Sequence, residues 1–338
     1  MPRRGGRPIR SPTPWRGLPR DAVVLAALLA LILAGCGAGT AAPPPQTTRE
    51  SAETTTTAPV FLPGTGRPPV TIGDKNFTEQ FILGELYGQA LAAQGFTVTL
   101  NKNIGSTQVT TQALGSGQLD MYPEYVGTFD SAVANDTEIF RSEHDALAAA
   151  QHYADAHGLH LLRPTPFSDT DAIAVLSSYG AQHHLRLIAD LGRLQSSLTL
   201  GAPPQFAGSQ SGLLGIQAAY GVTPAHVQPV AIGLQYQALE NGSVQAADVF
   251  TTDGQLASGQ YQLLRDPDRV FGFGNVVPVV TQGALLAEGP AFAQTIDSVS
   301  AQLTTPAIRQ LNADVSLYNM TPASAAHQFL LTHGLITG

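Results

Sequence analysis

From about residue 70 onwards, short continuous apolar runs alternate with stretches in which apolar residues recur at helical spacing. Short apolar runs at 69–73 and 96–100 are typical of buried strands. Between them, apolar residues recur at helical spacing from Thr78, and Phe77 and Ile82 are placed as a hydrophobic staple around a Thr78 cap. The same patterns predict further strands at 119–123, 172–176, 198–201, 227–231, 245–250 and 276–281, and helices at 106–116 and throughout 289–333. Strands that alternate with helices indicate an α/β fold.

One stretch of this pattern occurs twice. TQALGSGQLDMYPEYVGT (111–128) and YQALENGSVQAADVFTTD (236–253) share the letters QAL at an offset of 125 residues. At that offset Tyr125 corresponds to Phe250, and each copy is a predicted helix, a glycine-containing turn and a strand that ends in an aromatic residue. Two similar α/β lobes of this kind would form a cleft lined by aromatic side chains from both sides. The alternative is a chance match among Ala, Gln and Leu in a sequence rich in them.

The N-terminal part of the chain does not share the pattern. An arginine-rich leader precedes the apolar run 22–34, whose 13 residues are fewer than the about 20 that a membrane-spanning helix needs. Such a run is typical of a secretory signal, and it ends in the letters LAGC, which resemble a bacterial lipobox. We therefore expect a signal peptide at 1–35, a lipid on Cys36 and a tether rich in Thr and Pro at 36–69.

Charge and cysteine content narrow the functional classes. Without the predicted signal peptide the chain has 11 basic and 24 acidic residues, so no basic surface suited to nucleic acid is expected. The acidic balance suits a cationic ligand, although it also serves solubility. Cys36 is the only cysteine, which excludes an intramolecular disulfide. The paired Arg3 and Arg4 leave export by the general or the twin-arginine route open.

Three segments carry a family resemblance: IGDKNFTEQFILGEL (72–86), GSTQVTTQALGSGQLDMYPEYVGT (105–128) and VFTTDGQL (249–256). They resemble the substrate-binding proteins of osmoprotectant ABC importers, which bind glycine betaine, carnitine, choline and related quaternary amines. The resemblance implies a two-lobed α/β periplasmic-binding-protein fold, type II-like, with a hinge cleft between the lobes. Within a binding domain at 70–338, lobe one would comprise 70–167 plus 267–338, and lobe two 168–266.

The resemblance also implies partners. The protein would capture its solute at the outer face of the cell membrane, held there by the lipid anchor, and hand it to a membrane permease that a separate ATPase drives. The chain has no GxxxxGK[ST] phosphate loop, so ATP hydrolysis is expected elsewhere. No cofactor, metal or catalytic residue is expected.

The expected ligand accounts for the residues around YPEY. A quaternary ammonium has no N–H to donate, so aromatic ring faces hold it through cation–π contacts of about 0.5–2 kcal/mol each. The resemblance makes Tyr125 one wall of such an aromatic cage, and it places Lys75 and Thr128 where the family grips a ligand carboxylate. Tyr122 and Glu124 alternate with Tyr125 along the strand, so we expect them to face away from the ligand and to serve packing.

Four other family positions differ in this chain. The second cage aromatic falls on Asp171, and the third falls on Phe250, which keeps a ring face without a hydroxyl. The fourth falls at or near Gly274, with Phe273 within reach, and an arginine that the family uses on the carboxylate falls on Ser209. We therefore expect a preference for a cation without a carboxylate, such as choline. The alternative is that Asp171 points to solvent and nearby aromatic residues replace the missing ones.

Three other functional classes remain as alternatives. A metal importer would need paired ligands, but His152 and His157 are five residues apart on a predicted helix, off the spacing of a ligand pair. An enzyme would need more than the carboxylates of Asp120 and Glu124, since no GxSxG or HExxH motif accompanies them. A solute-sensing lipoprotein would need the same closing cleft as an importer, so the sequence leaves that alternative open.

Overall fold

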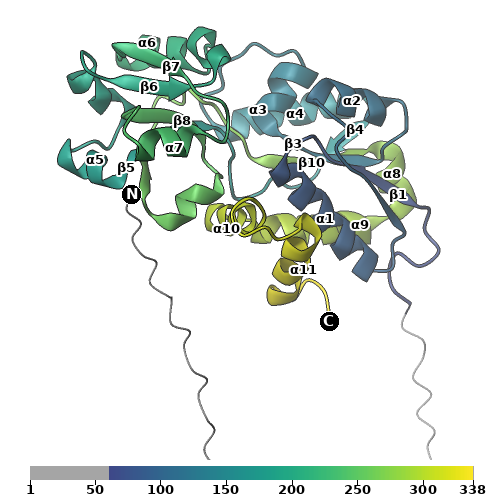
Figure 1. The fold of residues 1–338 in the computed structure, drawn as a ribbon. Helices are drawn as coiled ribbons and strands as arrows, with labels where there is room; N and C mark the ends of the chain where they lie inside the picture. Colours follow the sequence, from purple (N-terminus) through teal and green to yellow (C-terminus); the bar gives the residue numbers. More distant parts are fainter. Residues whose placement is uncertain (1–60, 338) are drawn as a thin grey trace, which may run out of the picture. The chain divides into compact units, whose positions relative to one another are not determined.

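The computed structural model describes residues 61–337, which form two five-stranded sheets with helices packed on them (Figure 1). The chain divides into Met1–Ala58 and Pro59–Gly338, and both sheets belong to the second part. The predicted signal peptide, the predicted lipidation site Cys36 and the tether up to residue 60 lie outside the described residues. No helix within 61–337 is both long and apolar enough to cross a membrane.

The first sheet has the strand order β2-β1-β3-β10-β4. β1 pairs in parallel with β2 and β3, while β10 pairs antiparallel with β3 and β4. Its strands are β1 (Val70–Gly73), β2 (Val98–Asn101), β3 (Met121–Tyr125), β4 (Leu159–Leu161) and β10 (Val276–Thr281). The run of valines in β10 is buried throughout because alternate residues pack into different cores on the two faces of the sheet.

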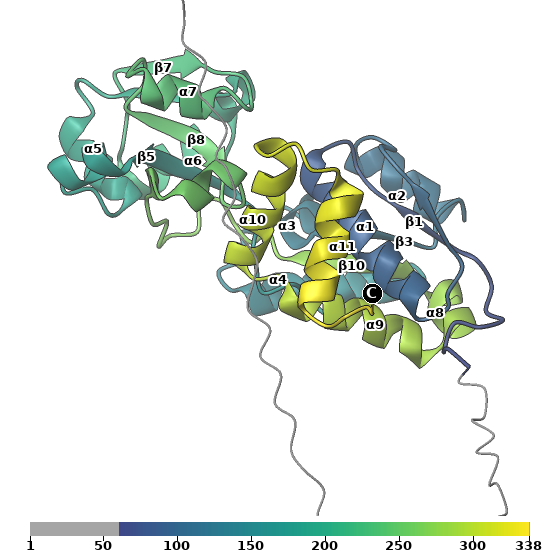
Figure 2. The same cartoon turned by 60° about the horizontal axis from the view of Figure 1, so that its bottom comes forward.

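Helices cover both faces of this sheet. One core joins α1 to the three helices at the C-terminal end, and Figure 2 shows α10 and α11 lying beside α1. A second core joins α2 and α4 to the other face. The helices are α1 (Thr78–Ala93), α2 (Thr107–Gly115), α3 (Val126–Thr128), the π-helix η1 (Phe129–Val133), α4 (Glu143–Ala156), α8 (Gln282–Glu288), α9 (Pro290–Gln302), α10 (Thr305–Ser316) and α11 (Pro322–Thr332).

The second sheet repeats the pairing of the first, in the order β7-β6-β8-β5-β9. β6 is parallel to β7 and β8, and β5 is antiparallel to β8 and β9. Its strands are β5 (Asp171–Leu176), β6 (Thr199–Ala202), β7 (His226–Pro229), β8 (Ala246–Phe250) and β9 (Tyr261–Leu263). Its helices are α5 (Ser177–Gln182), η2 (Ile188–Leu194), η3 (Pro204–Gly208), α6 (Leu213–Tyr220), α7 (Gln235–Glu240) and η4 (Gly254–Ser258).

Two segments cross between the sheets and run antiparallel to each other. Ser168 bridges to Asn275, and the Asp169 N–H donates to the Gly274 carbonyl at 2.9 Å. A Cβ at Gly274 would lie 1.7 Å from the Asp169 carbonyl oxygen, so no larger residue fits there. The close approach of the two crossing segments explains why the position expected to hold a fourth cage aromatic is a glycine, and the role of Phe273 as the replacement ring stays a prediction.

The N-terminus of α1 differs from the expectation. Thr78 is the first helical residue rather than the cap, and the N-cap residue Phe77 makes no side-chain cap hydrogen bond. Ile82 is buried in the first core, whereas Phe77 remains 39% exposed and stacks on Tyr125. The predicted staple is therefore wrong, because the Phe77 ring packs against a neighbouring strand end instead of its own helix.

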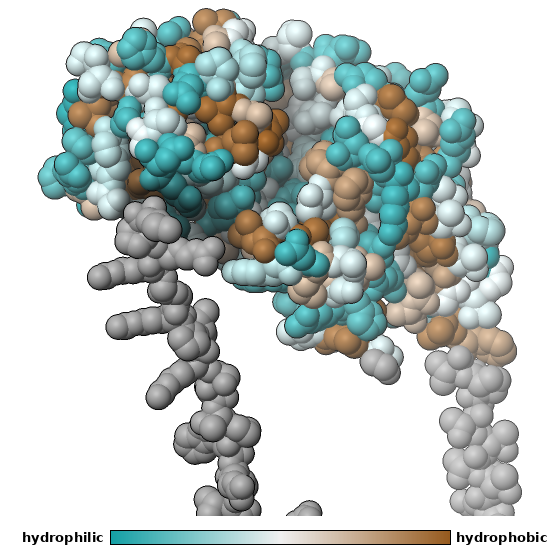
Figure 3. Space-filling view, viewed as in Figure 1, coloured by the Kyte–Doolittle hydropathy of each residue, from teal (hydrophilic) through white to brown (hydrophobic). Residues whose placement is uncertain are grey.

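Residues 61–69, at the end of the predicted tether, contact the folded chain. The Gly64 N–H donates to the Gln94 carbonyl at 2.9 Å, and Arg67 Nη1 donates to the Ala287 carbonyl at 2.9 Å. These bonds place the start of the packed chain before Val70. Figure 3 shows hydrophilic and hydrophobic residues interspersed over the face in view.

Candidate functional site

A cavity of about 1440 Å³ collects the predicted binding residues. Tyr125 and Phe250 lie at the ends of β3 and β8, and Asp171 stands opposite Phe250 in the antiparallel β5–β8 pair. The six predicted ligand-binding residues all line this cavity: Lys75, Tyr125, Thr128, Asp171, Phe250 and Phe273. Pockets for small ligands usually measure about 300–1,000 Å³, so a small quaternary amine would contact all its walls only after the cavity narrows.

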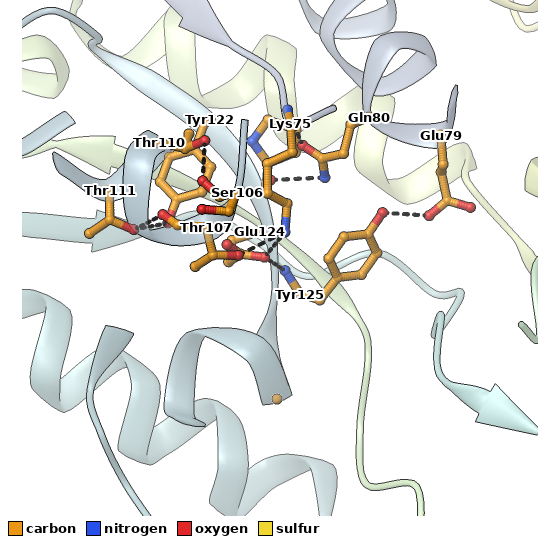
Figure 4. Close-up of polar contacts among 12 residues, drawn as sticks. Lys75, Glu79, Gln80, Ser106, Thr107, Thr110, Thr111, Tyr122, Glu124 and Tyr125 are labelled. Atoms are coloured by element: carbon orange, nitrogen blue, oxygen red, sulfur yellow. Dashed lines mark hydrogen bonds and ion pairs between the residues drawn. The ribbon is translucent and has the colours of Figure 1, made fainter. Parts of the chain in front are cut away.

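The motifs KNFTEQ and YPEY bind each other at one wall of the cavity (Figure 4). The Lys75 ammonium pairs with the Glu124 carboxylate, and the Tyr125 hydroxyl donates to Glu79 Oε1 at 2.8 Å. Gln80 accepts from the Lys75 N–H at 3.2 Å and donates to the Pro123 carbonyl at 3.0 Å. The spacing of the two motifs therefore reflects direct contact between the loop before α1 and the end of β3.

Lys75 differs from the expected role of a free cation. Its side chain is 6% exposed and that of Glu124 is fully buried, so the two charges compensate each other away from water. The ammonium also lies 3.4 Å from Thr107 Oγ1. A lysine that already has a carboxylate partner offers less attraction to a ligand carboxylate, and its predicted contact with the ligand stays a prediction.

Cations of the protein lie over aromatic rings in the cavity. The Lys75 ammonium is 4.8 Å from the centre of the Tyr125 ring and 5.7 Å from that of Phe77. Arg269 Cζ is 5.4 Å from the centre of the Phe273 ring. Tyr125 is only 6% exposed and Phe77 shields it, with ring centres 6.0 Å apart. Phe77 also lines the cavity and is more exposed, at 39%, than the predicted cage residue Tyr125.

The lining of the cavity is strongly acidic. Three of its residues are basic (Lys75, Arg141 and Arg269), and one of these is already paired with Glu124. Eight of its residues are acidic: Glu79, Asp130, Asp136, Glu138, Asp169, Asp171, Asp253 and Asp268. The formal charge of the lining is therefore −5, which favours a positively charged ligand.

Burial and mutual repulsion disfavour the charged form of several of these carboxyls. Burial raises the pKa of Glu79, and burial together with the charge of Glu79 raises the pKa of Asp169 well above its usual value. Burial raises the pKa of Asp171 to about 6. Behind the lining, burial and the charges of Asp171 and Asp253 raise the pKa of Asp248 to about 9. A cation bound among these groups would relieve the repulsion.

Helix α10 joins the carboxylate of Glu79 to the segment that follows β8. Asn312 Nδ2 donates to Glu79 Oε2 at 2.7 Å and to the Thr252 carbonyl at 2.9 Å. Arg309 Nε donates to the Thr251 carbonyl at 2.8 Å. Helix α10 packs in the core of the first sheet. These bonds therefore join the first sheet to the part of the cavity wall that follows β8 of the second sheet.

Sequence reasoning missed several residues of this site. Glu79 belongs to the KNFTEQ motif, and Asp169 precedes Asp171 in the same segment. Both could therefore have been proposed as site residues from their neighbours in the sequence. Asn312 and Asp130 lie outside the three segments that carry the family resemblance. Gly127, within YVGT, is explained by the fold: its N–H donates to the Phe273 carbonyl at 3.0 Å, and a Cβ would lie 2.6 Å from that oxygen.

The histidines lie away from the cavity. His157 stacks on Tyr153 with ring centres 3.9 Å apart, and no histidine is among the cavity-lining residues. Within residues 61–337, no three His, Cys, Asp or Glu side chains form a group that could hold a metal ion.

Comparison with known proteins gives consistent matches. The model of a family described as the substrate binding domain of ABC-type glycine betaine transport systems matches residues 68–331. A glycine-betaine-binding protein of Pseudomonas aeruginosa is 32% identical over 282 residues, which cover 78% of this chain and 88% of that protein. The glycine betaine-binding protein YehZ of Escherichia coli is 31% identical over 296 residues, covering 82% of this chain and 94% of the relative.

Solved structures show the same fold. A crystal structure of a glycine betaine/carnitine/choline ABC transporter superposes with a TM-score of 0.74, at 24% identity, over 79% of this chain and 99% of the other. The two mixed sheets with their helices are thus the periplasmic-binding-protein-like α/β fold that the sequence predicts.

Proposed function

The chain belongs to the family of substrate-binding domains of ABC-type glycine betaine transport systems, and on that premise we propose that it captures a quaternary amine for the permease of an ABC importer. The aromatic side chains of Phe77, Tyr125, Phe250 and Phe273 in one cavity support this ligand class, because ring faces attract cations that cannot donate hydrogen bonds. The proposed role is binding and delivery, without a catalytic step.

The preferred ligand is a cation without a carboxylate, such as choline. The observation that carries this preference is the formal charge of −5 on the cavity lining. Glycine betaine brings a carboxylate as well as a cation, and that carboxylate would face Asp171 and the other acids of the lining. Of the three basic residues in the lining, Lys75 is already paired with Glu124, which leaves Arg141 and Arg269 against eight acids.

Delivery would take place at the outer face of the cell membrane. The letters LAGC before a tether support lipidation of Cys36 after removal of residues 1–35. The anchor would keep the binding domain, proposed to have lobes at 70–167 plus 267–338 and at 168–266, close to the permease, and a separate ATPase subunit would drive transport.

Titration calorimetry with choline, carnitine and glycine betaine tests this function. We expect choline to bind at least about tenfold more tightly than glycine betaine, a difference of about 1.4 kcal/mol. Asp171→Ala should weaken choline binding, because it removes one negative charge from the lining. It should also reduce the difference in affinity between choline and glycine betaine. Tight glycine betaine binding that Asp171→Ala leaves unchanged would refute the preference, and the absence of binding by all three would refute the ligand class.

A further inference from the structure

Asp130 is an unusual residue of the cavity. Its side chain is 4% exposed, and neither of its carboxylate oxygens has a hydrogen-bond partner among the described residues. A buried carboxylate without partners is costly, because it loses its hydration and receives nothing in exchange. Burial, with a smaller contribution from the charge of Asp136, raises the pKa of Asp130 to about 7.

The local backbone holds this carboxylate next to the ligand-binding wall. Asp130 lies in the π-helix η1 (Phe129–Val133), which directly follows α3 and the predicted contacts Tyr125 and Thr128. π-Helical turns are rare and occur frequently at functional sites. Asp130, Thr128 and Tyr125 all line the same cavity, so the carboxylate and the ring border one space.

We propose that Asp130 is a second anionic subsite, which accepts a protonated amine or another N–H donor at the far end of the captured quaternary amine. The inference rests on the proposed function, since the quaternary head must occupy the aromatic side chains first. A ligand of this kind supplies charged N–H donors to Asp130, whereas choline offers one neutral O–H donor and glycine betaine offers no donor. The cavity of about 1440 Å³ leaves room for such an elongated ligand.

Matched ligand pairs test the subsite. Calorimetry would compare ω-aminoalkyl-trimethylammonium ions of increasing chain length with n-alkyl-trimethylammonium ions of equal length, on the chain without its predicted signal peptide. At the chain length that reaches Asp130, we expect the terminal amine to improve the affinity by about tenfold to hundredfold, as a charge-assisted hydrogen bond does. Asp130→Asn should abolish this advantage, while the affinity of the alkyl ion should fall only by the smaller amount that the loss of one negative charge from the lining causes.

Asp268→Asn provides the control. Asp268 also lines the cavity but is exposed, so this variant removes the same formal charge without removing a buried acceptor. We expect Asp268→Asn to keep the advantage of the amine. We also expect Asp130→Asn to raise the melting temperature of the ligand-free protein, because it removes an unpartnered buried charge.

Three outcomes contradict the inference in different ways. If no chain length shows an advantage for the amine, Asp130 is not a ligand subsite. If Asp130→Asn weakens both members of a pair by the same factor, so that the amine keeps its advantage, Asp130 contributes no specific contact to the amine and the inference fails. If none of these ions binds and choline does not bind either, the proposed function fails and the subsite fails with it.

Discussion

Lys75 and Glu124 form an ion pair between the loop before α1 and the end of β3, and burial gives this pair its importance. Glu124 also accepts from the Tyr125 N–H at 2.8 Å, so one carboxylate orders both the lysine and the backbone of the predicted cage residue. The Lys75 ammonium in turn lies over the rings of Phe77 and Tyr125. The pair therefore supports the wall on which the ligand's cation is proposed to bind.

Removing Glu124 should destabilise the protein strongly. Glu124→Ala leaves the Lys75 charge buried without a partner, which typically costs about 3–5 kcal/mol of folding free energy. Chemical denaturation of the ligand-free protein measures the loss. Arg163→Ala is the control, because Arg163 pairs with Asp297 while its side chain is 83% exposed, and such surface pairs contribute about 0–1 kcal/mol. Equal losses in the two variants would contradict this account of the pair.

At the scale of elements, the crossing segments between the sheets depend on a close backbone approach. Gly274 pairs with the segment of Ser168 and Asp169, and its N–H donates to Ser168 Oγ at 2.9 Å. Asn275, which precedes β10 and bridges to Ser168, and Phe273 flank this contact. A side chain at Gly274 would force the two segments apart.

Gly274→Ala should therefore lower the melting temperature and weaken choline binding together. The added methyl group cannot coexist with the Asp169 carbonyl oxygen, so Phe273 and Asp171 would move with their segments. Gly115→Ala is the matched control, since nothing lies within 4 Å of a Cβ there and Gly115 ends helix α2. Thermal melting and calorimetry of both variants check the prediction, and a fully stable Gly274→Ala protein would contradict it.

The sequence predicted most strands to within two residues because their apolar runs are continuous and bounded by turns. It missed β4 (Leu159–Leu161) and β9 (Tyr261–Leu263), whose three residues pair with distant strands at the sheet edges and leave no periodic pattern. It also misjudged Phe77, since the choice between a staple over its own helix and a stack on Tyr125 is made by tertiary packing.

Only the site residues that lie within recognisable sequence motifs could be predicted from the sequence. Lys75, Tyr125, Phe250 and their predicted partners do line one cavity, although no ligand contact is thereby established. The contact of Glu79 with Asn312 joins residues 233 positions apart, and no local pattern signals such a pair. Asp130 could be recognised only because its carboxylate has no hydrogen-bond partner among residues 61–337.

At the scale of the whole molecule, the acidic cavity links binding to pH. The pKa values of Asp171, about 6, and Asp130, about 7, lie above the usual value for an aspartate. Folding therefore favours their protonated forms, and their contribution to the stability of the ligand-free protein falls as pH rises from about 4, the usual pKa of an aspartate, to about 6 for Asp171 and about 7 for Asp130. A cation stabilises the ionised forms instead, so its affinity should increase over the same pH window.

Titration calorimetry of choline beside its neutral carbon isostere, 3,3-dimethyl-1-butanol, tests the central claim most directly. The two molecules share shape and hydroxyl and differ in the positive charge, which the aromatic and acidic lining is proposed to recognise. We expect choline to bind, more tightly at about pH 8 than at about pH 5, and the isostere to give no measurable heat. Equal binding of the two, or choline binding that weakens as pH rises, would contradict the account.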